Sequence, residues 1–125
     1  MKSPPRPTDS ELAILRVLWK HGPCTVRQVA GVLNVEREVG YTTVLKLMQI
    51  MIEKGLLLRD RASRCHVYRP RHSEDRTLGQ IVRDLLDRAF GGSSQKLVMQ
   101  ALSAQKASPQ ELEEIQKLLD EMKGA

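Results

Sequence analysis

One segment of the chain carries a polar face suited to hydrogen-bond chemistry. When residues 41–54 are placed about 100° apart, as in a helix, the apolar side chains gather on one side. The other side is polar and lightly charged, and it consists of Thr42, Thr43, Lys46, Gln49, Ile50 and Glu53. Hydroxyl, ammonium and carboxamide groups match the donors and acceptors that base pairs present in the major groove of DNA. This face predicts base recognition by a helix, although an ordinary solvated helix surface remains an alternative.

The residues of this face differ in their expected roles. Thr42 and Thr43 lie at the helix start, where hydroxyls and free backbone N–H groups suit phosphates or bases. Lys46 is expected to reach guanine or a phosphate, and Gln49 offers the donor–acceptor pair that adenine presents. Ile50 is expected to pack on a thymine methyl group. All five are candidate base contacts.

An arginine-rich segment follows this helix. Strands are predicted near 57–61 and 65–69, and together they form a hairpin with Ala62-Ser63 at its tip. A single acid, Asp60, accompanies five arginines in or beside this hairpin: Arg59, Arg61, Arg64, Arg69 and Arg71. Such side chains hold DNA phosphates without reading sequence. The candidate phosphate contacts are Tyr41, which is also placed on the core side of its helix, with Arg59, Arg61, Arg64 and Arg69.

Two further helices precede these elements. Thr8 to Glu11 and Thr25 to Gln28 both have the sequence of a capping box, which marks a helix start. Apolar residues then recur at helical spacing, namely Leu12, Leu15, Leu18 and Trp19 in the first helix and Val26, Val29, Ala30 and Leu33 in the second. Three helices and a hairpin predict a mainly α fold with a small β wing, the winged helix-turn-helix.

The second half of the chain carries apolar stripes at helical spacing. Gly91-Gly92 ends the first stripe, and a capping box at Ser108 to Glu111 precedes the last. Three short helices in about 50 residues cannot close a core alone, so a second copy is expected to cover them; packing on the first half is the alternative. The candidate interface residues are Leu78, Ile81, Leu85, Phe90, Leu112, Ile115, Leu119 and Met122. We therefore predict a DNA-binding domain over 1–72 and a helical dimerisation domain over 73–125.

Charge follows the same division. Residues 1–72 carry 13 Lys and Arg against 6 Asp and Glu, whereas residues 73–125 carry 7 against 9. A basic half beside a slightly acidic one indicates that only the first half meets a polyanion. No apolar run approaches the length of a signal-peptide core or a membrane span, so we expect a cytoplasmic protein without membrane insertion.

Other chemistry has little support in the sequence. The chain lacks a P-loop, a Gly-x-Ser-x-Gly and a His-Glu-x-x-His motif, so we predict no catalytic residues and no enzyme. Cys24, Cys65 and the three histidines lack metal-site spacing, and no metal or other cofactor is expected. Two alternatives remain: a metal- or ligand-responsive repressor anchored on the cysteines, and a winged-helix adaptor that binds protein.

Several short motifs occur in a fixed order. They are Leu12…Leu18-Trp19, Tyr41-Thr42-Thr43-Val44, Lys54-Gly55-Leu56-Leu57, His66-Val67-Tyr68-Arg69-Pro70, Phe90-Gly91-Gly92 and the helix start at Ser108. Together they resemble the penicillinase-repressor family of winged-helix regulators (the BlaI/MecI/CopY type). The resemblance implies a bacterial homodimeric repressor that binds a palindromic double-stranded operator, with Thr43 and Lys46 as the leading base contacts.

The chain departs from two branches of that family. The copper-responsive branch has a C-terminal cysteine cluster, whereas no cysteine follows Cys65 here. In the β-lactam-responsive branch, a membrane metallopeptidase system leads to cleavage at an Asn-Phe bond. The matching stretch, Leu97-Val98-Met99-Gln100-Ala101, lacks that pair. The resemblance thus implies cleavage near Gln100 and Ala101 by a membrane-linked protease system, with the inducing signal left open.

Overall fold

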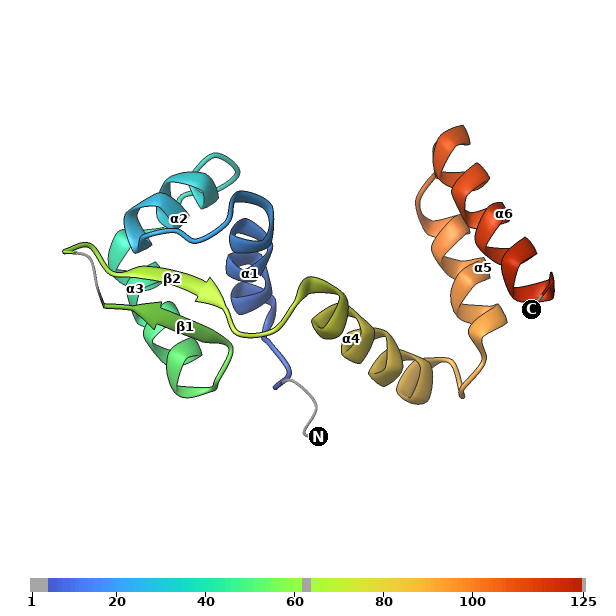
Figure 1. Cartoon of the computed structure of the whole chain (residues 1–125), viewed down its shortest axis with the longest axis horizontal. Coiled ribbons are helices and arrows are strands. Elements are labelled where there is room, and N and C mark those ends of the chain that lie inside the picture. The colour runs from blue at the N-terminus through green and yellow to red at the C-terminus, as the bar shows by residue number, and fades with distance from the viewer. Residues whose placement is uncertain (1–4, 62–63, 125) are drawn as a thin grey trace. The chain divides into compact units, whose positions relative to one another are not determined.

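The computed structural model describes residues 5–61 and 64–124, and the expected hairpin tip at Ala62-Ser63 lies outside them. Their elements are, in chain order, α1 (Asp9–His21), α2 (Val26–Leu33), α3 (Tyr41–Glu53), β1 (Leu57–Asp60), β2 (Val67–Pro70), α4 (Glu74–Ala89), α5 (Ser94–Ala104) and α6 (Pro109–Gly124) (Figure 1). The chain divides into two compact units, Met1–Arg83 and Asp84–Ala125, and the division falls within α4. The domain boundary expected after residue 72 lies earlier, between β2 and α4.

The first two helices begin as their sequences predict. The Thr8 hydroxyl accepts a hydrogen bond from the backbone N–H of Glu11 at 3.2 Å, and Glu11 Oε1 accepts one from the N–H of Thr8 at 2.9 Å. Thr25 and Gln28 repeat this exchange at 3.2 and 2.8 Å. Each pair satisfies backbone donors that have no partner within the helix. Both predicted capping boxes are confirmed.

The first unit is built around one apolar core. Its buried members come from all three helices and the hairpin: Ile14, Leu15, Val17, Leu18, Cys24, Val26, Val29, Ala30, Val44, Met48, Met51, Leu56, Leu57 and Tyr68. The predicted stripe of α1 needs a correction, because Leu12 and Trp19 are only half-buried whereas Ile14 and Val17 are buried. The reason is that α1 contacts α2, α3 and β2, so it buries a wider arc than one stripe.

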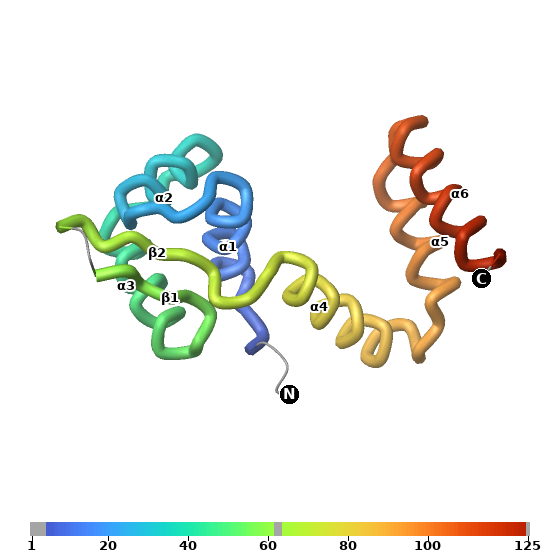
Figure 2. The backbone as a smooth tube through the Cα atoms, viewed as in Figure 1, coloured from blue at the N-terminus to red at the C-terminus, as the bar shows by residue number. Residues whose placement is uncertain are grey.

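The hairpin is antiparallel and shorter than predicted. Leu57 pairs with Pro70 and Asp60 with Val67. On the side away from β1, β2 also pairs with the segment between α1 and α2 (Figure 2). The N–H of Cys24 donates to the carbonyl of Tyr68 at 3.1 Å, and the N–H of Tyr68 donates back at 2.8 Å. This pairing holds the start of α2 against the wing.

Polar contacts fix the ends of this unit. Lys54 Nζ lies 2.6 Å from Glu11 Oε1, so the end of α3 is tied to the start of α1. Burial alone would raise the pKa of Glu11, which is 2% exposed, but hydrogen bonds from Lys54 and Thr8 outweigh it and lower that pKa. After the hairpin, Trp19 Nε1 donates to the carbonyl of His72 at 3.3 Å. Thr77 in α4 is also buried, so the first turn of α4 belongs to this unit.

The second unit has well-formed helices without a buried interior. Gly91 and Gly92 have φ of 55° and 82°, a left-handed backbone that ends α4 where predicted. The predicted capping box before α6 is confirmed, because Ser108 and Glu111 exchange hydrogen bonds of 3.1 and 3.0 Å. Among described residues 84–124, no side chain is buried.

Three helices followed by an antiparallel hairpin make the first unit a winged helix-turn-helix, and the predicted fold class is confirmed. Within the described residues, no helix combines the length and the apolar character that a membrane crossing requires.

Candidate nucleic-acid interface

The two sides of α3 differ sharply in exposure. Val44, Met48 and Met51 have no exposed surface. The five predicted base-contact residues are all exposed, and they are Thr42, Thr43, Lys46, Gln49 and Ile50. The prediction that α3 has one core side and one open polar side is thus confirmed. Tyr41, in contrast, is predicted on the core side but is 48% exposed, because it is the first residue of α3 and lies past the edge of the core.

The start of α3 leaves backbone donors available. Its N-cap is Gly40, and no side chain of the cap accepts a hydrogen bond from the first turn. The preceding turn is nevertheless fixed: Asn34 Nδ2 donates to the Ala30 carbonyl at 2.7 Å, and Asn34 Oδ1 accepts from the N–H of Val39 at 2.7 Å. Free N–H groups therefore stand beside the hydroxyls of Thr42 and Thr43, an arrangement that suits an anion.

The wing arginines lie on different faces of the hairpin. Arg59 is paired with Tyr68, and Arg69 with Leu58. Because side chains alternate along a strand, Arg59 shares the face of the buried Tyr68, whereas Arg69 lies on the opposite face. Arg59 is half-buried, and its Nε is a buried atom without a hydrogen-bond partner among the described residues.

The other two arginines stand beside the hairpin tip. Arg61 and Arg64 are exposed at the ends of the described parts of the hairpin. Arg64, with Tyr41, lines a hollow of about 370 Å³ between α2, α3 and the hairpin. Of the predicted phosphate contacts, the hollow therefore brings these two together at the start of α3.

Sequence reasoning missed Arg27, which lines the same hollow. Its guanidinium carbon lies 5.6 Å from the centroid of the Tyr41 ring. The signal available in the sequence was weak, because Arg27 is simply an exposed residue in the first turn of α2. Its proximity to Tyr41 depends on how α2 packs against α3, which no local pattern encodes.

Neither cysteine joins a site of metal type. Cys24 is buried, its Sγ donates to the Gly22 carbonyl at 3.2 Å, and burial raises the pKa of its thiol. Cys65 is exposed on the hairpin. Across residues 5–61 and 64–124, the structure holds no group of three His, Cys, Asp or Glu side chains placed to bind one ion.

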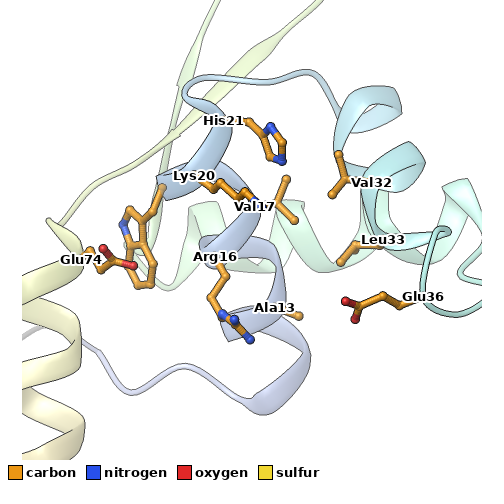
Figure 3. A pocket seen from close by; sticks show the side chains of 10 residues that line it. Ala13, Arg16, Val17, Lys20, His21, Val32, Leu33, Glu36 and Glu74 are labelled. Carbon is orange, nitrogen blue, oxygen red and sulfur yellow. The ribbon is translucent and has the colours of Figure 1, made fainter. Parts of the chain in front are cut away.

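Another hollow of the first unit, about 510 Å³, is lined by none of the predicted DNA contacts (Figure 3). Its walls come from α1, α2, the residues after it and the start of α4, and none comes from α3 or the hairpin. This hollow is lined by Arg16, Lys20 and His21 of α1 together with the acidic Glu36 and Glu74. The charges are mixed, so this hollow is a poor match for a polyanion.

The predicted interface residues of the second half are open to solvent. Leu78, Leu85, Leu112, Leu119 and Met122 are between 41% and 68% exposed. Ile81, Phe90 and Ile115 are half-buried. Gln100 and Ala101, the expected cleavage site, are exposed in the second half of α5.

Comparison with known proteins identifies the family. The sequence profile of the penicillinase repressor family matches residues 7–121. The chain belongs to this family. It is 35% identical over 92 residues to a transcriptional regulator BlaI of Mycobacterium tuberculosis, covering 73% of this chain and 67% of that protein. It is 27% identical over 123 residues to the penicillinase repressor of Bacillus licheniformis, covering 98% and 96%.

Solved structures of penicillinase repressors share the fold of the first unit. One is the monomeric form of Bacillus licheniformis BlaI in complex with the blaP half-operator, with a TM-score of 0.52 and 29% identity over 60% of this chain and 92% of that one. Another is the DNA-binding domain of the repressor BlaI, with a TM-score of 0.51 and 30% identity, covering 59% and 90%. The predicted family is confirmed, and the relatives that the chain matches are a transcriptional regulator and a penicillinase repressor.

Proposed function

We propose that this chain is a transcriptional repressor that binds double-stranded operator DNA as a homodimer, with α3 of each copy in the major groove of one half-site. The observation that carries the proposal is the exposed polar face of α3, opposite the fully buried Val44, Met48 and Met51. A helix of this kind presents hydrogen-bonding groups to base edges while its core side keeps it rigid. The related BlaI structure with a half-operator supports this assignment.

Within this proposal, α3 supplies the base contacts, and the wing supplies most of the phosphate contacts. Thr43 and Lys46 are the leading base contacts, and Thr42, Gln49 and Ile50 complete the reading face. The phosphate contacts are Tyr41, Arg59, Arg61, Arg64 and Arg69.

Residues 1–72 bind DNA in this scheme, and residues 73–125 pair with a second copy. A two-fold pair presents two recognition helices to a palindromic site. The exposed apolar residues of α4 and α6 support this pairing, since a stable chain rarely leaves so many leucines in water. A bacterial transcriptional repressor acts in the cytoplasm, where we expect this protein.

Release by proteolysis is the second part of the proposal. A membrane-linked protease system would cut near Gln100 and Ala101, and the cut would separate α6 from the rest of the pairing lobe. Both residues lie inside α5, so this helix must unwind locally before a protease can bind its backbone. Recovery of an intact 125-residue chain from cells with derepressed promoters would contradict this route.

The binding proposal is tested by selecting duplexes from a random pool with the full chain. The selected sequence should contain two symmetric half-sites. Lys46→Ala should weaken binding to it by about 1–3 kcal/mol and relax the preference at one or two base pairs of each half-site. Lys117→Ala in α6 is the matched control and should change neither the affinity nor the base preference. Failure of the wild-type chain to enrich any sequence would refute the proposed function.

A further inference from the structure

The hollow between α2, α3 and the hairpin carries positive charge without a balancing acid. Its walls include Arg27 from α2, Tyr41 from α3, and Arg64 and His66 from the hairpin. No Asp or Glu is among the residues that line it. Within residues 5–61 and 64–124, neither Arg27 nor Arg64 has a carboxylate partner. Two uncompensated guanidinium groups around one opening favour an anionic ligand.

Two other hollows of this unit differ from it in charge. The hollow of about 510 Å³ combines its cations with Glu36 and Glu74, and one of about 300 Å³ is lined by Arg37 together with Glu38. Acids in those walls offset the cations and repel an anion. Of the three hollows, the one beside Tyr41 is therefore the one suited to a phosphate.

Tyr41 holds Arg27 in place. The guanidinium carbon lies 5.6 Å from the ring centroid, within the range of a cation–π contact. A ring attracts the cation through its face and takes none of the guanidinium N–H donors. Arg27 is thus oriented with its N–H donors open to a ligand, whereas a carboxylate partner would occupy those donors.

We infer that this hollow is a phosphate-binding site for duplex DNA, with Arg27 as its main contact and Tyr41 as the residue that positions it. The inference rests on the proposed function, since α3 must lie in the major groove. The sugar-phosphate strands then run along the flanks of α3, where the hollow opens at its first turn. Arg27 of α2 and Arg64 of the hairpin bind one phosphate together, and this contact fixes the register of α3 on the bases.

The test compares the salt dependence of binding by full-length variants. The probe is the duplex selected by the wild-type chain, followed by fluorescence anisotropy from roughly 50 to 300 mM KCl. Arg27→Ala should lower the slope of log K against log salt by about 0.9 per half-site, and affinity by on the order of tenfold per half-site at 0.1 M salt. Base preference should stay unchanged. Arg16→Ala, which removes an exposed arginine of α1 beside the mixed hollow, should leave the slope as it is.

The role of Tyr41 needs a separate comparison. Tyr41→Leu should weaken binding clearly more in the wild type than in the Arg27→Ala background, where only the direct contact of the Tyr41 hydroxyl with phosphate is left to lose. Tyr41→Phe keeps the ring, loses only that direct contact and should retain most of the affinity. Arg27→Lys keeps the charge and should retain the slope. Thermal melting should show that these exposed substitutions leave the fold intact, and Arg27→Gln replaces Arg27→Ala if that variant melts early.

The outcomes separate the two proposals. Equal slopes for Arg27→Ala and Arg16→Ala would overturn the phosphate site while leaving operator binding in place. Additive losses for Tyr41→Leu and Arg27→Ala would overturn the positioning role of Tyr41. A wild-type chain that selects no duplex would instead refute the proposed function itself.

Discussion

The two units of the chain differ in how far their apolar side chains are exposed to solvent. In Met1–Arg83, Ile14, Val29 and Met48 have no exposed surface, whereas in Asp84–Ala125, Leu118 is 56% and Met122 is 68% exposed. The helices of both units are amphipathic and similarly capped. The difference therefore lies in what covers the apolar face, and local helix signals do not determine it.

Burial follows from the number of elements that meet. In the first unit, α1 contacts α2, α3 and β2, so its apolar arc is closed from several directions. Burying apolar surface is the main favourable contribution to folding, at roughly 25 cal/mol per Å². The first unit buries its apolar surface within one chain. The second unit is expected to bury its apolar surface only against a second copy.

The largest expected effect comes from separating the units. A fragment of residues 1–83, which retains the buried Thr77 of α4, should fold as a monomer, while the full chain sediments as a dimer. The fragment presents one recognition helix, so its affinity for the selected duplex should fall by about 10³ or more. Sedimentation equilibrium and anisotropy measure the two quantities. A full chain that remains monomeric at micromolar concentration would erase the contrast between the units.

Single apolar truncations should sharpen the same contrast. Met48→Ala removes a side chain with no exposed surface and should cost about 2–5 kcal/mol of unfolding free energy at every protein concentration. Leu119→Ala in α6 should instead weaken dimerisation by about 1.5–3 kcal/mol per buried side chain. Its effect on melting should therefore depend on protein concentration. Concentration-independent losses for both variants would mean that α6 packs within its own chain.

The sequence predicted the features that depend on neighbouring residues. The capping boxes at Thr8, Thr25 and Ser108 and the glycine stop after α4 are confirmed because each is decided within a few residues. The open face of α3 is confirmed for a similar reason, since helical periodicity alone separates its two sides.

Features that depend on packing between elements were missed or misplaced. Tyr41 fell on the core side of a helical wheel, but as the first residue of α3 it lies past the edge of the core, which begins with Val44. Arg27 meets Tyr41 only because α2 crosses α3 there, and Ile14 is buried only because several elements surround α1. The opposite faces of Arg59 and Arg69 follow from the strand register, which the hairpin sequence did not define.

The smallest expected effect compares two glutamates with the same local geometry. Glu11 and Glu111 each close a capping box, and hydrogen bonding lowers the pKa of Glu111 as well. Only Glu11 is buried and paired with Lys54, which retains 35% exposure. Glu11→Gln should therefore cost about 1–2 kcal/mol near pH 7, in the lower range for a charge-assisted contact because Lys54 is partly hydrated.

The pH dependence of that cost has a definite sign. The folded-state pKa of Glu11 lies below its ordinary value of 4.5, so the carboxylate stabilises the fold fully above that value. The contribution is lost as pH falls through the lowered pKa, and the wild type should then approach Glu11→Gln in stability. Urea unfolding between pH 7 and pH 3 follows this convergence, and Glu111→Gln is the matched control with a much smaller change. Equal responses of the two variants would mean that burial beside Lys54 adds nothing to an exposed helix cap.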